Sequence, residues 1–261
     1  MAKQTLLEIV KDILSDMDSD EVNSIDDTIE SSQVTAIVVS TLRAMYANRN
    51  WPHTRRLVNL TASGDSSKPT IMSITDNVKE VISVYYNKAK VTDTGLKFMP
   101  VKWIEPDDML RVMYNRNTAD SHVVTFDGGG GQTFIVTNNA APTYYTSFDD
   151  TTIVFDSYDA AVDTTLTAAK TQMRAYTTPV ISITDSYIPD LPEEAFPLLT
   201  EEAKSKCQFK LKQFNDVKAE QESKRQNQWI SRKSWRVNGG IKYPSYGRNK
   251  ARLVDPTFKQ E

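Results

Sequence analysis

The fold is decided in large part by residues 188–217, which read IPDLPEEAFPLLTEEAKSKCQFKLKQFNDV. Pro189 and Pro192 break the chain here, because the residue before a proline is pushed out of helical geometry. Glu193 and Glu194 then suit the start of a helix, whose N-terminal end favours negative charge. The apolar residues that follow are three or four positions apart and predict one continuous buried stripe: Phe196, Leu199, Ala203, Cys207, Leu211 and Phe214.

The stripe stops after Val217, although the residues that follow are still good helix formers. We therefore predict a single helix from Glu193 to Trp235, spanning roughly 60 Å at about 1.5 Å per residue. Its second half offers the core of its own domain almost no apolar side chain, so we expect it to project as an arm. Gly239 and Gly240 should end the helix, and Tyr243 to Glu261 should form an extended tail that a partner orders.

The N-terminal region predicts two more helices. Thr5 and Glu8 form a capping box, in which each side chain satisfies a backbone N–H at the helix start. We expect an amphipathic helix over residues 5–17, an acidic loop over 18–27 and a second helix over about 29–49. Asn50-Trp51-Pro52 should end that second helix.

The middle of the chain has a different composition. Residues 57–183 are rich in Thr, Val, Ile and Tyr in short runs broken by Gly, Asp and Asn, which is typical of strands. A short helix should begin at Pro106, and a further helix is expected over residues 160–175, where alanine favours it and threonine opposes it. The predicted strands are residues 78–86, 97–104, 122–126 paired with 132–137, and 144–148 paired with 152–155.

These patterns predict an α+β fold. A helical body forms from the N-terminal helices and the long C-terminal helix, with a β-rich insert between them and an extended C-terminal tail. The expected boundaries are 1–56 for the N-terminal helical part, 57–185 for the insert, 186–236 for the C-terminal helix with its arm, and 237–261 for the docking tail.

Composition limits the class of protein. The 261 residues are 39% apolar and 25% charged, which fits a folded soluble protein. No apolar run approaches the roughly 18 to 20 residues that span a bilayer, so no membrane partner is expected. Acidic residues at Glu8, Asp12 and Asp16 argue against a secretory signal. The single cysteine excludes an internal disulfide and a multi-cysteine zinc site.

Charge is distributed unevenly along the chain. Residues 1–30 contain nine acidic residues against Lys3 and Lys11, whereas residues 224–252 contain nine basic residues and no acid. Such a chain can pair with copies of itself, with an acidic partner or with nucleic acid, and the two runs can also be separately solvated surfaces. The acidic residues are Glu8, Asp12, Asp16, Asp18, Asp20, Glu21, Asp26, Asp27 and Glu30.

No catalytic arrangement is recognisable. The glycines at 128–131 lack the Lys-Ser/Thr pair of a phosphate-binding loop and are better explained as a hairpin loop. His53 and His122 lie far apart in the sequence, and Cys207 lies on an apolar stripe, where burial makes a thiol inert. Asp149, Asp150, Asp156 and Asp159 match no calcium loop, and turn or surface roles are favoured over weak calcium binding. We expect no enzyme activity, cofactor or metal.

The basic C-terminal end, with aromatic residues interleaved, is the strongest functional signal. Bases and aromatics bind nucleic acid by phosphate contacts and stacking, and protein interfaces are enriched in the same residue types. We favour docking to a protein partner over DNA. The candidate docking residues are Trp229, Arg232, Lys233, Trp235, Arg236, Lys242, Tyr243, Tyr246, Arg248, Lys250, Arg252 and Phe258.

Several segments together resemble a known family, the head-to-tail adaptors of short-tailed bacteriophages, also called tail tubular protein A or head-completion ring proteins. The similarity is one of layout over most of the chain, and no single segment is a diagnostic motif. The segments are Leu6 to Val10 with the helix pair that ends at Ala47-Asn48-Arg49-Asn50-Trp51-Pro52, then Tyr144 to Asp150, Ile153 to Tyr158, and Ile188 to Pro192 before the C-terminal helix.

The resemblance implies a structural virion protein that assembles in the host cytoplasm and lies in the virion neck, between the capsid portal and the tail. It implies a homo-oligomeric ring, commonly of twelve copies, that binds the portal protein and a tail tube or nozzle protein and extends the DNA channel. The docking segment on the portal would be about Gln228 to Glu261. The β-rich insert is much larger than in the smaller members of the family, so the partner that it contacts stays open. A DNA-binding protein, or another tail or baseplate component, remains an alternative.

Overall fold

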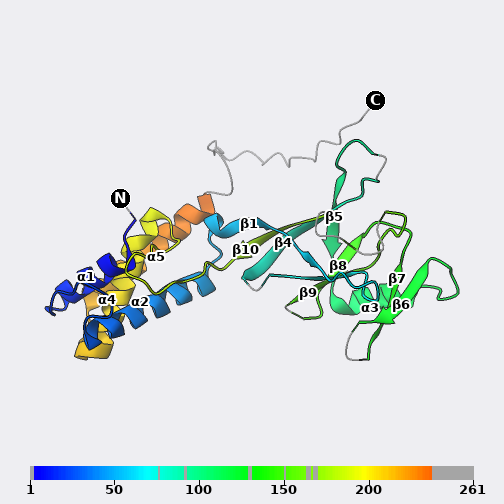
Figure 1. The fold of residues 1–261 in the computed structure, drawn as a ribbon. Helices are drawn as coiled ribbons and strands as arrows, with labels where there is room; N and C mark the ends of the chain where they lie inside the picture. The colour runs from blue at the N-terminus through cyan, green and yellow to red at the C-terminus, as the bar shows by residue number, and fades with distance from the viewer. Residues whose placement is uncertain are drawn as a thin grey trace, which may run out of the picture.

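The computed structural model describes residues 3–75, 77–90, 93–128, 131–149, 151–162, 166 and 170–236, the side chains of 233–236 excepted. These residues form an elongated molecule with α1, α2, α4 and α5 at one end and most of the β-structure, together with α3, at the other (Figure 1). The mixed α+β class predicted from the sequence is confirmed. We call the two regions the helical body (α1, α2, α4 and α5) and the β-rich lobe (residues 55–177).

The N-terminal helices form as predicted. Helix α1 spans Leu6–Asp16 and helix α2 spans Ile29–Asn48. The capping box is present at the start of α1, where the Glu8 amide donates to Thr5 Oγ1 and the Thr5 amide donates to the Glu8 carboxylate. Helix α2 begins with an equivalent pair, Thr28 and Ser31. Local side-chain chemistry therefore determines where both helices start.

The C-terminal region differs from the prediction of one long helix. A 3-10 turn at Glu193–Ala195 leads into α4 (Phe196–Lys212), which ends at Gln213 in the left-handed conformation with φ of 53°. Helix α5 (Val217–Arg236) then packs along α4 instead of continuing it. The prediction of a projecting arm is therefore wrong: the second half lies on the helical body (Figure 1).

Small and polar side chains hold α5 in this position. Ala219 and Ser223 are buried, and their small side chains let the two helices approach closely. The Ser223 hydroxyl donates to the Glu202 carboxylate on α4. At the start of α5 the Asp216 carboxylate accepts from the amides of Lys218 and Ala219, as an N-cap does. Further along α5, Ile230 is partly buried against the core of the helical body. The helix is thus anchored by its N-terminal cap, by small buried residues and by Ile230.

One hydrophobic core fills the helical body. Four of the six residues in the predicted stripe of α4 are buried, Leu211 is partly buried and Phe214 lies beyond the helix end, 64% exposed. The fully buried side chains of this core are Leu6, Ile9, Val10, Ile13, Val34, Val38, Leu42, Ala195, Leu199, Ala203 and Cys207.

The β-rich lobe is built on an eight-stranded sheet of order β1-β10-β4-β5-β8-β9-β3-β2. All neighbours are antiparallel except β5 and β8. A separate antiparallel pair, β6 and β7, forms the predicted glycine hairpin. The strands are β1 (Arg55–Val58), β2 (Thr61–Ala62), β3 (Ile71–Ser73), β4 (Val78–Asn87), β5 (Phe98–Trp103), β6 (Val123–Asp127), β7 (Thr133–Thr137), β8 (Tyr144–Thr146), β9 (Thr152–Phe155) and β10 (Thr171–Thr177).

Most predictions for this region hold. Strands β4 and β5, both hairpins and helix α3 (Pro106–Tyr114) lie where they were expected. The helix expected over 160–175 is wrong where the chain is described, because β10 begins at Thr171. Residues 163–165 and 167–169 lie outside the described residues. Tertiary contacts stabilise the strand more than local propensity favours a helix. Strand β10 pairs on both edges, with β1 and β4, and buries Met173 and Ala175 in the lobe's core.

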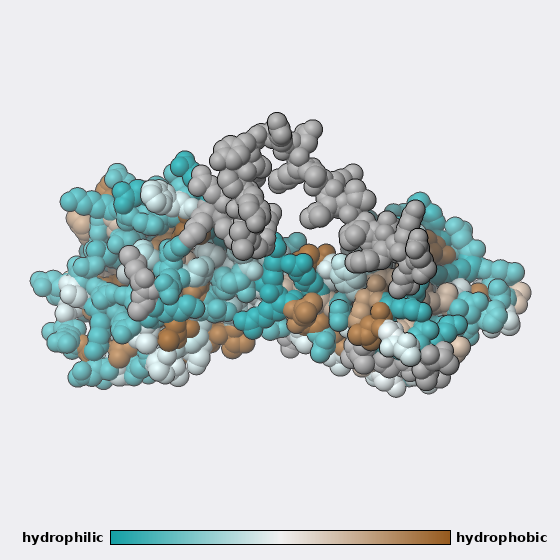
Figure 2. Space-filling model, turned by 90° about the horizontal axis from the view of Figure 1, so that it is seen from above, coloured by the Kyte–Doolittle hydropathy of each residue, from teal (hydrophilic) through white to brown (hydrophobic). Residues whose placement is uncertain are grey.

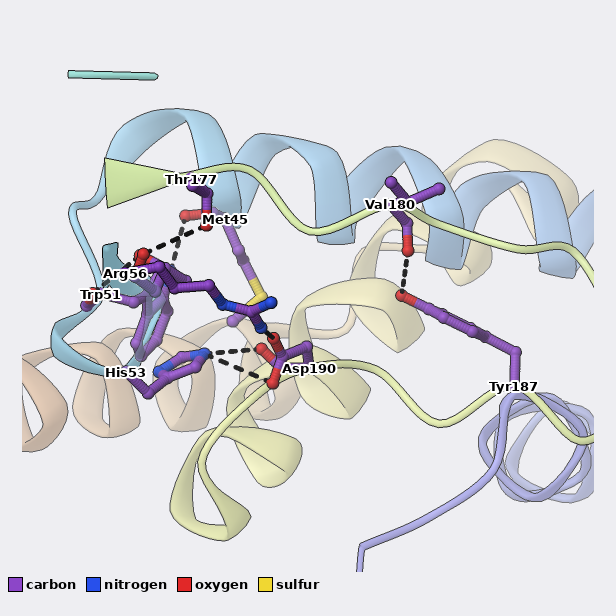
Figure 3. Close-up of polar contacts among 9 residues, drawn as sticks. Met45, Trp51, His53, Arg56, Thr177, Val180, Tyr187 and Asp190 are labelled. Carbon is purple, nitrogen blue, oxygen red and sulfur yellow. Dashed lines mark hydrogen bonds and ion pairs between the residues drawn. The ribbon is translucent and has the colours of Figure 1, made fainter. Parts of the chain in front are cut away.

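Polar contacts join the two regions. His53 Nε2 lies 2.7 Å from the backbone oxygen of Asp190, and the Arg56 guanidinium pairs with the Asp190 carboxylate at 3.3 Å (Figure 3). On the other side, Lys79 Nζ of β4 donates to the carbonyls of Tyr46, Ala47 and Arg49, at the end of α2. A cation at this position satisfies backbone oxygens that the helix leaves free. The junction is therefore held by hydrogen bonds and charge.

Candidate docking surface

The structure describes part of the predicted docking segment. Trp229 is 68% exposed on α5, and Arg232 is exposed three residues further along the same helix. Lys233, Trp235 and Arg236 belong to the last turn of α5, but their side chains are outside the described part. The remaining predicted docking residues also lie outside it: Lys242, Tyr243, Tyr246, Arg248, Lys250, Arg252 and Phe258.

The basic charges of α5 are partly compensated within the helix. Lys224 pairs with Glu220 at 2.5 Å, and Arg225 pairs with Glu222 at 2.8 Å. Such exposed pairs add little stability, but they reduce the net positive charge of the helix's first half. Arg232 comes after the last acidic residue of α5, next to exposed Trp229 on the adjacent turn. The exposed Trp229 side chain and the uncompensated positive charge thus lie together in the last two turns of α5.

Contacts with α2 fix the position of this part of α5. Arg49, the residue after α2, donates from Nη2 to Asn227 Oδ1 at 3.0 Å and to the Ser231 hydroxyl. Its guanidinium also lies over the Trp51 ring, 5.1 Å from the centroid. Sequence reasoning missed this arrangement. The sequence signal for it was Asn215-Asp216, a helix-start pair that should have divided the predicted long helix in two.

A cleft opens where α2, α4 and α5 meet. Its volume is about 260 Å³, and its lining combines apolar surface from Met45 and Leu198 with the polar side chains of Arg49, Lys206 and Asn227. Burial lowers the pKa of Arg49, because its charge has lost solvation. Arg49 Nη1 is buried and has no hydrogen-bond partner among the described residues. We call this feature the Arg49 cleft.

Apolar residues are also exposed at the far end of the helical body. Phe209, Phe214 and Val217 flank the turn between α4 and α5, and each is more than half exposed.

On the face seen in Figure 2, hydrophobic residues form small separate groups among hydrophilic ones. The described part of this face therefore resembles a polar interface more than the continuous apolar surface of an obligate one.

Two acidic residues of the N-terminal region are paired within the chain. Asp16 binds Lys204 at 2.7 Å, and Glu30 binds Lys212 at 3.4 Å, both on α4. These carboxylates therefore help to hold the helical body together. Other carboxylates of the loop between α1 and α2 are exposed: Asp18, Asp20, Glu21 and Asp26.

The candidate catalytic side chains occupy structural positions. Cys207 is buried among apolar residues, and this burial raises the pKa of its thiol to about 12, so that it stays protonated at neutral pH. His53 lies in the junction, where its ring contacts Trp51 and the backbone of Asp190. His122 lies on an exposed turn before β6. The two histidines are thus in different regions and share no site.

The acidic residues that match no calcium loop in the sequence have other partners in the structure. Asp149 accepts from the amides of Thr151 and Thr152, and Asp159 accepts from the amide of Ala161, so both stabilise turns. Asp156 is buried and pairs with Arg116 at 3.3 Å. Asp150 lies outside the described residues. In the described part of the chain no group of three or more potential ligands is placed to hold a metal ion.

At the two ends of the glycine-rich loop, Gly128 and Gly131, the structure requires glycine. A Cβ on Gly128 would lie 2.4 Å from the Phe134 ring, and Gly131 adopts a positive φ of 78°. Residues 129 and 130 lie outside the described residues. Because the loop joins two strands and no helix follows it, it lacks the geometry of a phosphate-binding loop, and the hairpin prediction is confirmed.

Comparison with models of known protein families and with curated protein sequences found no match to this chain. Within the described residues, no helix is long and apolar enough to cross a membrane. The surface of α5, the Arg49 cleft and the exposed acidic loop are therefore the features from which a function can be inferred.

Proposed function

We propose that this protein is a structural, non-enzymatic component of a short-tailed phage virion. In this role it is a head-to-tail adaptor that forms a ring, of about twelve copies by the family resemblance, between the portal and the tail tube or nozzle protein. It would assemble in the host cytoplasm, occupy the virion neck and extend the channel through which genomic DNA passes.

The observation that carries the proposal is the placement of Trp229 and Arg232. Helix α5 is fixed on the helical body through Ser223 and Arg49, so it directs the basic, aromatic segment that follows from a defined point. Interfaces use exposed tryptophan and arginine as anchors, since each buries a large area and keeps polar contacts. A rigid base with a basic tail beyond it suits docking on a preformed ring.

The elongated shape also suits an adaptor. The helical body and the β-rich lobe lie at opposite ends of the chain's described part (Figure 1). Under this proposal the helical body docks on the portal, whereas the lobe meets the tail protein or neighbouring copies. The proposed partners thus contact different regions of the molecule.

The decisive experiment mixes the purified chain with its phage's portal ring and follows mass and shape by light scattering and electron microscopy. The full chain should form a ring on the portal, and deletion of Tyr243 to Glu261 should abolish that binding while circular dichroism stays unchanged. Trp229→Ala should weaken binding about tenfold or more, as loss of an interface anchor does. Phe209→Ala is the matched control, since Phe209 is 65% exposed on α4. Full binding by the truncated chain would remove the docking proposal.

DNA binding is the second candidate. Exposed Trp229 beside Arg232 could stack on bases while the basic residues contact phosphates. Binding to random duplex should then weaken steeply with salt, because counterions are released. If the chain does not bind the portal and its binding to DNA shows this salt dependence, DNA binding is favoured over the adaptor role.

A further inference from the structure

Arg49 is a cation without a carboxylate partner among the described residues. Its Nη2 donates to Asn227 and Ser231, both neutral, and its Nη1 is buried without any hydrogen-bond partner there. Leaving a charged donor buried and unsatisfied costs free energy, more than leaving a neutral one. The position is therefore unfavourable in the isolated chain unless a further group reaches the guanidinium.

The Arg49 cleft has room for such a group. Its volume of about 260 Å³ suits a side chain better than an extended ligand. The other basic residue in the lining, Lys206, already binds Glu202 at 3.1 Å and the Thr41 hydroxyl at 3.3 Å. Glu202 is itself satisfied by Lys206 and Ser223. Arg49 is thus the cation in the cleft lining for which no carboxylate partner is seen in the described residues, and a carboxylate is the strongest complement of a guanidinium.

We propose that the Arg49 cleft receives a carboxylate from the acidic segment, residues 18–27, of a second copy of this chain. The inference rests on the proposed ring and identifies the contact between its neighbours. The acidic segment offers four exposed carboxylates for which no ion pair is seen in the described residues: Asp18, Asp20, Glu21 and Asp26.

The positions of the two features suit a repeating contact. Ser19 of the acidic segment donates to Glu30, in the first turn of α2, whereas Arg49 follows the last residue of the same helix. The 20 residues of α2 separate them by about 30 Å. Arg49 therefore cannot take a carboxylate from its own acidic segment. A contact between different surfaces of two copies is heterologous, and such contacts close into rings when the rotation allows.

Cross-linking between singly substituted proteins tests the contact directly. Asp20→Cys is placed in the acidic segment of one protein and Asn48→Cys, on the exposed rim of the cleft, in another of different size. A short bis-maleimide is added to the mixture, free and on the portal ring. Cys207 stays in place, because it is buried and its thiol is protonated. The control is Lys102→Cys, exposed on β5.

We expect Asp20→Cys to join Asn48→Cys and not Lys102→Cys, and adding Arg49→Gln should reduce the yield about tenfold or more. A joint Asp18→Asn, Asp20→Asn, Glu21→Gln and Asp26→Asn variant should weaken self-association, measured by sedimentation, as much as Arg49→Gln does. Combining the two sets should add nothing further, because both remove one interaction. Equal yields with both cysteine partners, additive losses, or no association under either condition would overturn the inference.

The outcomes separate this inference from the adaptor proposal. A chain that binds the portal but gives no cross-link between Asp20→Cys and Asn48→Cys keeps its proposed function and loses the Arg49 contact. A chain that gives the cross-link and does not bind the portal is a self-associating protein of another kind. The two failures are read from different measurements.

Discussion

The helical body and the β-rich lobe bury their apolar residues in separate cores that share no residue. In the helical body, the pair of Lys204 with Asp16 has an exposed carboxylate, with side chains 19% and 48% exposed. In the lobe, Arg116 and Asp156 form a pair with side chains only 15% and 8% exposed. The body is thus held mainly by apolar packing, and the lobe by packing around a buried polar centre.

That difference follows from how each region is connected. Helices satisfy their own backbone, so the body needs only caps and an apolar face. The lobe brings loops and strand ends together, where backbone groups need side-chain partners. Asp156 accepts from the amides of Thr143 and Tyr144, and Arg116 Nη1 donates to the carbonyls of Ile135 and Asp156. The buried pair therefore completes hydrogen bonds that the sheet leaves open.

The largest expected effects come from the two cores. Phe155→Ala in the lobe should cost about 4 kcal/mol, and Leu199→Ala in the helical body about 3 kcal/mol, since both side chains are fully buried. Because the cores are separate and the junction is polar, each change should destabilise mainly its own region. Hydrogen exchange resolved by peptide measures this. Equal loss of protection in both regions would show that they unfold as one unit.

Removing one charge from an ion pair should cost more in the β-rich lobe than in the helical body. Arg116→Met should cost about 3 kcal/mol, because it leaves Asp156 buried without its cation and two carbonyls without a donor. Asp16→Asn removes a pair whose carboxylate is 48% exposed and should cost less than about 1 kcal/mol. Urea denaturation of both variants gives the comparison. Similar costs would contradict the distinction between a buried polar centre and a solvated surface.

The sequence predicted the features that depend on local interactions and missed those that depend on contacts between distant residues. Caps and periodicity are local, so α1, α2, α3 and both hairpins were predicted. The pairing of β1 with β10 joins residues more than one hundred positions apart, and no local pattern encodes it. The helix expected near residue 171 failed for that reason, because the strand is stabilised by its neighbours.

The candidate surface was predicted only in part. The composition near Trp229 and Arg232 predicts docking, which stays a prediction, and both side chains are exposed. The Arg49 cleft could not be predicted, since it forms only when α5 folds back to bring Asn227 beside the end of α2. Ala219 and Ser223 are buried where α5 folds back, and such small side chains give little apolar signal in a sequence.

Acidic pH should loosen the contact between α4 and α5. Burial by itself would raise the pKa of Glu202, but hydrogen bonds from Ser223 and Lys206 lower it overall. A carboxyl whose folded pKa lies below its unfolded value stabilises above the unfolded value, about 4.3, and loses this as pH falls through the folded pKa. Protection of α5 against hydrogen exchange should therefore fall as the pH drops below the unfolded value.

The neighbouring residue Glu201 provides the matched control with the opposite sign. Burial raises its pKa, and the carboxylates of Asp16, Glu222 and Asp216 add to this, although Lys204 opposes it. Its charged form is therefore disfavoured in the folded state. Glu202→Gln should remove part of the acid sensitivity and lower stability at neutral pH, whereas Glu201→Gln should raise stability there. Identical effects of the two variants would contradict these assignments.

The smallest expected effect concerns the turn between α4 and α5. Because of this turn, the two helices pack side by side and do not form one continuous helix. Gln213 adopts a left-handed conformation with φ of 53°, which glycine tolerates better than glutamine. Gln213→Gly should therefore stabilise the protein by about 0.5 kcal/mol, after the greater freedom of glycine in the unfolded chain is subtracted. The control, Gln221→Gly within α5, should instead cost about 1 kcal/mol, because glycine weakens a helix interior. Thermal denaturation distinguishes the signs, and destabilisation by Gln213→Gly would indicate that α4 continues through this position in solution.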